Sequence, residues 1–272
     1  MKGLEAEFAA AEIDFSKVGF YDDPSFLACE QKNHLYLEKY AEYVLKRKYS
    51  SEYIERAKRE IPFIAHILNE ELVKDGRLGA CIDISIGLSR ILEQEGFWNY
   101  IPKGCLTIDF PTATKIEKKF FYSADFGNFD AGHVWVVAPP FNVIDLSVKQ
   151  QPYQDRAGEY LPNIICSTSN IEVKANDSDI ISPEGRAYMK MYGMNGTMYD
   201  IRPDWKDFVS RFKSIAVKEN NLNFKYITTA ISAPDMPIEK VVTLTLSGKY
   251  TIEVYNDIVV PRLKEFRAKN KK

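Results

Sequence analysis

The spacing of apolar residues changes near Gly96, and this change constrains the fold more than any other feature of the chain. Before that point, apolar residues recur at intervals of three and four over residues 31–73 and again from Cys81 onward, which predicts helices. After it, short apolar stretches are separated by Gly, Pro, Asn and Asp, which predicts strands. These stretches are residues 98–110, 119–123, 133–138 and 142–147. We therefore expect helices before Gly96 and strands after it.

Local signals refine this expectation. Ser50 supplies an N-cap for the second of the two helices before Cys81, and Pro62 is expected to kink or split that helix. Patterns in the last third of the chain are weaker. A helix is expected over residues 204–218, and a hairpin is expected from residues 241–246 and 250–254.

Cys81 begins the helix that follows the flexible pair Gly79-Ala80. The free N–H groups and the positive dipole end of a helix start favour a thiolate, whereas Asp83 in the same turn opposes it. A core cysteine is the alternative interpretation of this pattern. Reactivity at Cys81 therefore depends on a partner elsewhere in the chain.

A histidine and an aspartate lie in two apolar strands that flank a turn at Pro139-Pro140. If the turn is centred there, His133 lies opposite Leu146 or, with a shift of one residue, opposite Asp145. A hairpin can thus bring an imidazole and a carboxylate within hydrogen-bonding distance. A carboxylate stabilises the imidazolium form of a histidine, and an imidazolium beside a cysteine stabilises the thiolate. Cys81, His133 and Asp145 are therefore candidates for nucleophile, base and orienting group.

Three segments in this order resemble the transglutaminase-like branch of the papain-like cysteine enzymes. They are Gly79-Ala80-Cys81 at a helix start, Gly132-His133-Val134-Trp135-Val136 in a strand, and Ile144-Asp145-Leu146. The resemblance covers roughly residues 76–150. It implies an α+β unit in which the cysteine helix packs on an antiparallel sheet that carries the histidine and the aspartate. It also implies Cys81 as nucleophile, His133 as general base and acid, and Asp145 as the residue that orients the histidine.

The chemistry common to this superfamily is attack of a thiolate on an amide or ester, which gives a thioester that water or an amine then resolves. We therefore expect a cysteine-dependent hydrolase, a peptidase or amidase, that acts on a peptide, a protein or a small amide without a dissociable cofactor. Acyl transfer to an amine, as in crosslinking, and deamidation are the alternatives within catalysis. A non-catalytic interaction domain of the same fold is the alternative from another class.

Two features depart from the superfamily pattern. No glutamine shortly precedes Cys81, which leaves oxyanion stabilisation to the Cys81 backbone N–H and an unidentified partner. The segment 146–150 also matches no named enzyme of the superfamily, which leaves the substrate open. Alternatively, His133 is a buried strand histidine and Asp145 a turn carboxylate. A structural zinc site formed by Cys81, His133 and Asp145 would lack a fourth ligand, so we expect no metal.

Charge and cysteine usage bear on partners and compartment. The net charge is −2 and the pI about 6.0, so we expect no general binding to nucleic acid or to acidic membranes. No stretch reaches the roughly 20 apolar residues of a membrane helix, and we expect no signal peptide in the first fifteen residues, which carry four acidic side chains and no uninterrupted apolar run. Four separated cysteines without a C-x-x-C pair fit a reducing cytoplasm, although an exported toxin or effector would look the same. These cysteines are Cys29, Cys81, Cys105 and Cys166, of which Cys105 is expected to be least accessible.

The chain divides into an N-terminal helical part (1–75), a catalytic core (76–155) and a C-terminal extension without an assigned role (156–272), or forms one domain. The loop 125–132 lies directly before His133. It either shapes substrate access or only connects two strands.

Overall fold

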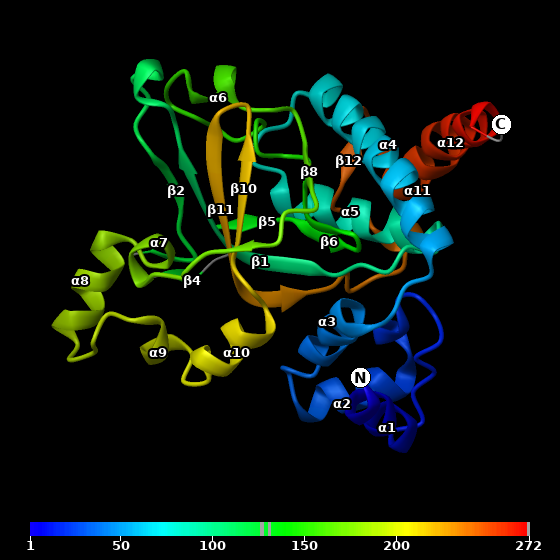
Figure 1. Ribbon diagram of the computed structural model, residues 1–272, viewed down its shortest axis with the longest axis horizontal. Coiled ribbons are helices and arrows are strands. Elements are labelled where there is room, and N and C mark those ends of the chain that lie inside the picture. Colours follow the sequence, from blue (N-terminus) through cyan, green and yellow to red (C-terminus); the bar gives the residue numbers. More distant parts are fainter. Residues whose placement is uncertain (126–127, 130–131, 271–272) are drawn as a thin grey trace.

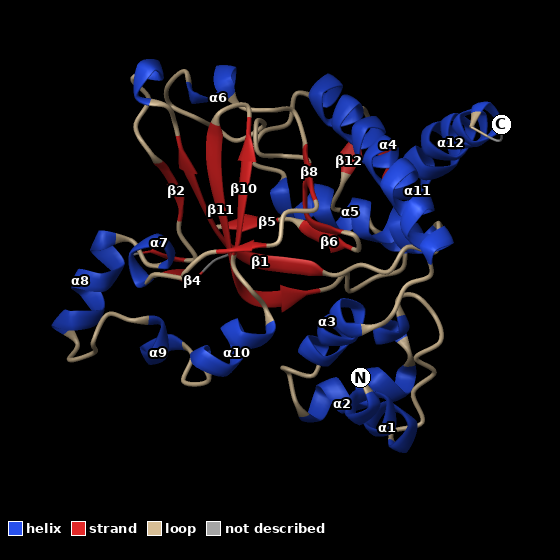
Figure 2. Ribbon diagram, in the orientation of Figure 1, coloured by secondary structure: helices blue, strands red, loops and turns tan. Residues whose placement is uncertain are grey.

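The computed structural model describes residues 1–125, 128–129 and 132–270 of the chain. Helices and antiparallel sheets both make up large parts of it, so the fold is α+β, as the sequence predicts (Figure 2). The main sheet has the strand order β2-β1-β11-β10-β9, and β5 also pairs with β1. These strands are β1 (Ile101–Asp109), β2 (Lys119–Phe121), β5 (His133–Val134), β9 (Ile171–Glu172), β10 (Ile215–Glu219) and β11 (Leu222–Ser232).

A second sheet, with the order β6-β7-β8, continues from β5. Only Trp135 separates β5 from β6, and a bridge between Tyr100 and Val137 joins the second sheet to the region before β1. The two sheets therefore meet at the segment that carries His133. The second sheet comprises β6 (Val136–Ala138), β7 (Phe141–Asp145) and β8 (Ile165–Ser167). Two further strand pairs are short: β3 (Ala124–Asp125) pairs with β4 (Asn128–Phe129), and β12 (Thr245–Leu246) pairs with β13 (Lys249–Tyr250).

At Gly104 the backbone packing leaves no room for a side chain. Gly104 pairs with His133 on β5 and with Thr228 on β11, next to a bulge in the β1–β11 ladder. A Cβ atom at this position would lie 1.9 Å from the backbone oxygen of Ile227. Glycine therefore allows β5 and β11 to approach β1 closely, and this approach fixes the backbone position of His133.

Two helices, α4 (Ser51–Asp75) and α5 (Cys81–Gln94), pack against each other beside the second sheet (Figure 1). Ser50 caps α4, because its hydroxyl oxygen accepts a hydrogen bond from the backbone N–H of Tyr53 at 3.2 Å. α4 continues through Pro62, so the expected split of this helix is wrong. Its apolar residues on both sides of the proline are buried, and tertiary packing of this kind outweighs one lost backbone hydrogen bond.

The C-terminal helices lie against α4 (Figure 1). They are α11 (Thr251–Val254), one π-helical turn, η4 (Tyr255–Val259), and α12 (Val260–Lys269). Only the inner part of the expected hairpin forms, as β12 and β13, and residues 251–254 are helical instead of extended. Glu253 explains this error, because its carboxylate accepts a hydrogen bond from the backbone N–H of Tyr250 at 2.7 Å and stabilises a helix start there.

Aromatic side chains form the core of the N-terminal part. Their rings pack mostly edge to face, which is the favoured geometry of aromatic pairs. The cluster consists of Phe8, Phe20, Phe26, Tyr36, Tyr40, Tyr43 and Trp98. All of these residues except Tyr36 and Trp98 lie on four helices, which are α1 (Lys2–Ala10), η1 (Phe20–Asp22), α2 (Pro24–Lys32) and α3 (Leu37–Lys46).

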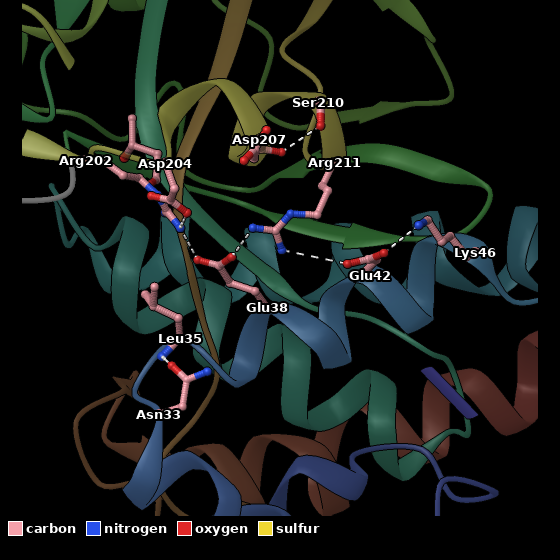
Figure 3. A network of polar contacts seen from close by, with 11 residues as sticks. Asn33, Leu35, Glu38, Glu42, Lys46, Arg202, Asp204, Asp207, Ser210 and Arg211 are labelled. Atoms are coloured by element: carbon pink, nitrogen blue, oxygen red, sulfur yellow. Dashed lines mark hydrogen bonds and ion pairs between the residues drawn. The ribbon is translucent and has the colours of Figure 1, made fainter. Parts of the chain in front are cut away.

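A buried ion cluster joins α3 to a segment more than 160 residues later in the chain. Glu38 on α3 is 5% exposed, and its carboxylate binds the guanidinium groups of Arg202 and Arg211 (Figure 3). Arg202 also binds Asp204 at 2.9 Å, and Arg211 lies 3.8 Å from Glu42. The cluster therefore connects the N-terminal helices with the C-terminal part of the chain.

The expected helix over 204–218 is only partly present. It ends at Arg211, and Ile215–Glu219 form β10 instead. β10 pairs with β11 along its whole length, so sheet pairing outweighs the local helical pattern. The remaining helices are η2 (Thr112–Thr114), α6 (Ala157–Tyr160), α7 (Asp177–Ile180), α8 (Pro183–Met191), α9 (Met198–Ile201), α10 (Trp205–Arg211) and η3 (Ile238–Lys240).

The main sheet contains strands from both the middle and the last part of the chain. β1, from residues 76–155, pairs over its whole length with β11, from residues 156–272. Among the described residues, no helix is long and apolar enough to cross a membrane.

Candidate active site

The structure places the side chains of His133 and Asp145 in direct contact. Nε2 of His133 lies 2.6 Å from Oδ2 of Asp145, and both residues are essentially inaccessible to solvent. In the hairpin formed by β6 and β7, Val136 pairs with Ile144 and Ala138 pairs with Phe141, and the strand register shifts between these two pairs. Before Val136 the chain leaves β7 and joins β1. The imidazole thus reaches the carboxylate across the junction of the two sheets.

Asp145 receives further hydrogen bonds. The backbone N–H of Ser147 donates to Oδ1 at 2.9 Å, its hydroxyl to the same oxygen at 3.2 Å, and the hydroxyl of Tyr226 to Oδ2 at 2.9 Å. Burial alone would raise the pKa of Asp145, but the positive charge of His133 and these hydrogen bonds outweigh it and lower the pKa below its ordinary value. Asp145 is therefore held as a carboxylate, facing the imidazole.

His133 is held as an imidazolium. Burial alone would lower its pKa, but the charge of Asp145, the hydrogen bond to that carboxylate and the interaction with the side chain of Cys81 raise it to about 10. The second ring nitrogen, Nδ1, is buried and makes no hydrogen bond of normal geometry to any described residue. One nitrogen is thus fixed by a carboxylate, while the other lies beside the thiol of Cys81 without a hydrogen bond of normal geometry.

The start of α5 positions the thiol. Cys81 is the first residue of this helix, as the sequence predicts, and it is 7% exposed. One turn later on the same face, the hydroxyl of Ser85 lies 3.4 Å from the carbonyl oxygen of Val134, the residue after His133. This contact docks the helix on β5 and brings the Cys81 side chain to the imidazole. Asp83, which alone would oppose a thiolate, is paired with Arg77 at 3.3 Å.

The loop before Cys81 is open to solvent. Leu78 is 59% exposed and Ile82 is 43% exposed, so apolar side chains flank the thiol on both sides in the sequence. Gly79 has φ 71°, and no heavy atom lies within 4 Å of the position that its Cβ would occupy. The chain two residues before Cys81 therefore borders open space, while Cys81 itself is buried.

The other cysteines and histidines lie elsewhere. Cys105 is fully buried, as expected, and burial raises its pKa to about 12. Burial, with a contribution from Asp145, likewise raises the pKa of Cys166 to about 12. His66 is half exposed and pairs with Glu70 at 3.2 Å on α4. Within residues 1–125, 128–129 and 132–270, no group of three or more His, Cys, Asp and Glu side chains is placed to hold a metal ion.

Sequence reasoning missed two residues that contact Asp145. Ser147 follows it in a D-x-S pattern, which is typical of a local turn in which the carboxylate accepts a backbone N–H. Tyr226 lies 81 residues later on β11, and no local signal connects it to the site. The loop 125–132 lies partly outside the described residues, since residues 126–127 and 130–131 are not described.

Comparison with known proteins found no relative that could assign a role to Cys81, His133 or Asp145. No family model matches the chain, and no curated protein and no solved structure matches it either.

Proposed function

We propose that the chain is a cysteine-dependent hydrolase, a peptidase or amidase, in which Cys81, His133 and Asp145 form a catalytic triad. The observation that carries this proposal is the buried imidazole of His133. Its Nε2 is bound to a carboxylate at 2.6 Å, and its Nδ1 interacts with the thiol of Cys81 and has no other partner among the described residues. A histidine with only a packing role would have both nitrogens satisfied, because buried polar atoms are normally hydrogen-bonded.

The charges of the site suit an ion-pair mechanism. An imidazolium beside Cys81 stabilises a thiolate, which attacks the carbonyl carbon of an amide or ester and forms a carbon–sulfur bond. The carbonyl electron pair moves onto oxygen, where the N–H of Cys81 can stabilise it. Collapse of this intermediate breaks the bond to the leaving group, which takes the Nδ1 proton of His133. A thioester on Cys81 and a neutral imidazole result.

Water completes the cycle. Neutral His133 accepts a proton from water as the oxygen attacks the thioester, and the second intermediate expels the sulfur of Cys81 as a thiolate. A carboxylic acid is released and the ion pair is restored. Asp145 holds the ring so that Nδ1 faces the sulfur throughout, and it stabilises each imidazolium form.

We further propose that this region corresponds to the core of the papain-like, transglutaminase-like superfamily. Two observations support this. The cysteine opens a helix that packs on antiparallel strands, and those strands carry the histidine and the aspartate in the order of the superfamily.

Trapping the thioester tests the proposal. Incubation with p-nitrophenyl acetate and rapid acid quenching should give one acetyl adduct on Cys81 by intact mass and peptide mapping, and hydroxylamine should remove it. Cys81→Ala is the control and should give no such adduct. Absence of the adduct from the well-folded wild type, with no release of p-nitrophenol above the control, would contradict the proposal. Added glycinamide separates the acyl acceptors, because a hydrolase yields acetate whereas an acyltransferase yields N-acetylglycinamide.

A further inference from the structure

The side chain of Gln150 carries a buried amide oxygen that makes no hydrogen bond to any described residue. The residue is 9% exposed, and its Oε1 position is buried without a partner among the described residues. Leaving a buried polar group unpaired destabilises a fold, so each such group in a native structure calls for a reason. A glutamine amide can turn over to present either its oxygen or its NH2 group at one position.

The backbone places Gln150 against the loop that leads to the nucleophile. Its carbonyl oxygen accepts a hydrogen bond from the N–H of Gly79 at 2.8 Å, two residues before Cys81. The adjacent side chain fixes this segment, since Nε2 of Gln151 donates to the carbonyl oxygen of Ser147 at 3.0 Å. Of the two neighbouring buried glutamines, Gln151 therefore stabilises its own segment through its side chain, whereas Gln150 has a side-chain oxygen without a partner and a backbone that is bonded to the loop before α5.

The start of α5 offers a donor of its own. No side chain caps this helix, and its first hydrogen bond runs from the N–H of Ile84 to the carbonyl oxygen of Ala80 at 2.9 Å. The N–H of Cys81 thus has no partner inside the helix. A negative oxygen on the carbon attacked by the sulfur of Cys81 would meet this N–H.

We propose that the carboxamide of Gln150 is the second donor, and that it forms an oxyanion hole together with the backbone N–H of Cys81. This proposal rests on the thiol chemistry proposed above. As the carbon–sulfur bond forms, the carbonyl electron pair moves onto oxygen, and the Gln150 NH2 group donates to that oxygen. As the carbonyl re-forms and the leaving group departs with the proton of His133, this hydrogen bond weakens. Gln150 thus stabilises the transition state more than the bound substrate.

Gln150→Met tests the proposal, because methionine keeps the length of the side chain and removes both N–H groups. The burst rate of p-nitrophenol release from p-nitrophenyl acetate should fall by about 10²–10³-fold, as on loss of an oxyanion-hole donor. Alkylation of Cys81 by iodoacetamide should keep its wild-type rate, because attack on a saturated carbon forms no oxyanion. The pair of readouts separates an oxyanion donor from a residue that only supports the fold.

Gln151→Met is the matched control, since it removes the same amide from a side chain of similar burial. It should lower Tm through the lost hydrogen bond to Ser147 and leave the burst rate of the folded protein close to that of the wild type. If Gln150→Met does not fold, Gln150→Leu replaces it, because leucine removes the donors without adding a charge. A wild-type burst rate in a folded Gln150 variant overturns the proposal, as does an equal loss of acylation and alkylation. A wild type that is neither acylated nor alkylated overturns the proposed function itself, and the role of Gln150 with it.

Discussion

Replacing Tyr226 by Phe removes one hydroxyl group from the candidate site and leaves the ring in place. That hydroxyl donates to Oδ2 of Asp145 at 2.9 Å, and both side chains are buried. A hydrogen bond to a charged group contributes about 1.5–3 kcal/mol to the free energy of unfolding. In a chain of this size 1 kcal/mol shifts Tm by about 2–4 °C, so Tyr226→Phe should lower Tm by about 3–12 °C at neutral pH.

The loss should depend on pH, because the hydrogen bond is strong only while Asp145 is ionised. The pKa of Asp145 lies below its ordinary value in the folded protein. The stability that this carboxylate contributes is therefore present above its ordinary pKa and is lost as the pH falls through its native-state pKa. The difference in Tm between the wild type and Tyr226→Phe should be greatest near neutral pH and should shrink in acid.

Tyr153→Phe is the matched control for this experiment. The hydroxyl of Tyr153 donates to the uncharged carbonyl oxygen of Val148 at 2.7 Å, so its loss should cost about 0.5–1.5 kcal/mol without a comparable dependence on pH. Thermal unfolding of the three proteins by circular dichroism, across neutral and acidic pH, measures both effects. Equal Tm values of Tyr226→Phe and the wild type at neutral pH would refute the reasoning. So would a difference that persists unchanged in acid.

Three further predictions concern other parts of the molecule. In a turnover assay, Asp145→Asn should reduce the rate by as much as about 10⁴-fold, because the imidazole of His133 is then held in the wrong tautomer. The double mutant with Cys81→Ala should be hardly slower than Cys81→Ala alone, because residues that act as one unit are not additive. Iodoacetamide at neutral pH should modify Cys105 and Cys166 more slowly than Cys81, because burial raises the pKa of each of these two thiols to about 12. Peptide mapping that finds faster labelling of Cys105 or Cys166 would place the nucleophile elsewhere. Glu38→Gln should lower the free energy of unfolding by about 3–5 kcal/mol in urea titrations, because two arginines lose the buried charge that pairs with them; an unchanged midpoint would show that the cluster does not stabilise the fold.

The parts of the site that the sequence predicts are those fixed by local geometry. His133 and Asp145 lie twelve residues apart on the two sides of one turn, so alternation along two strands predicts that they lie close, although His133 itself pairs with β1 and not with β7. Cys81 opens a helix because a flexible Gly79-Ala80 pair precedes a continuous apolar pattern. Such features depend on residues close in sequence, and the structure agrees with them.

The parts that the sequence does not predict depend on distant pairing. Tyr226 reaches Asp145 only because β11 runs antiparallel to β1, and nothing near Tyr226 in the sequence indicates that neighbour. The same pairing makes residues 215–219 a strand although their pattern suits the end of a helix. The unpaired amide of Gln150 is likewise a property of the folded interior, since a polar residue after a strand ordinarily indicates a loop.

Modification of Cys81 by a small electrophile tests the central claim most directly. The wild type, His133→Ala and Cys81→Ala would be treated with iodoacetamide at neutral pH, and the adducts would be followed by intact mass and located by peptide mapping. The ion pair predicts one rapid adduct on Cys81 in the wild type, a much slower reaction of Cys81 in His133→Ala, and no rapid adduct in Cys81→Ala. Equal rates at Cys81 in the wild type and in a well-folded His133→Ala protein would contradict the account.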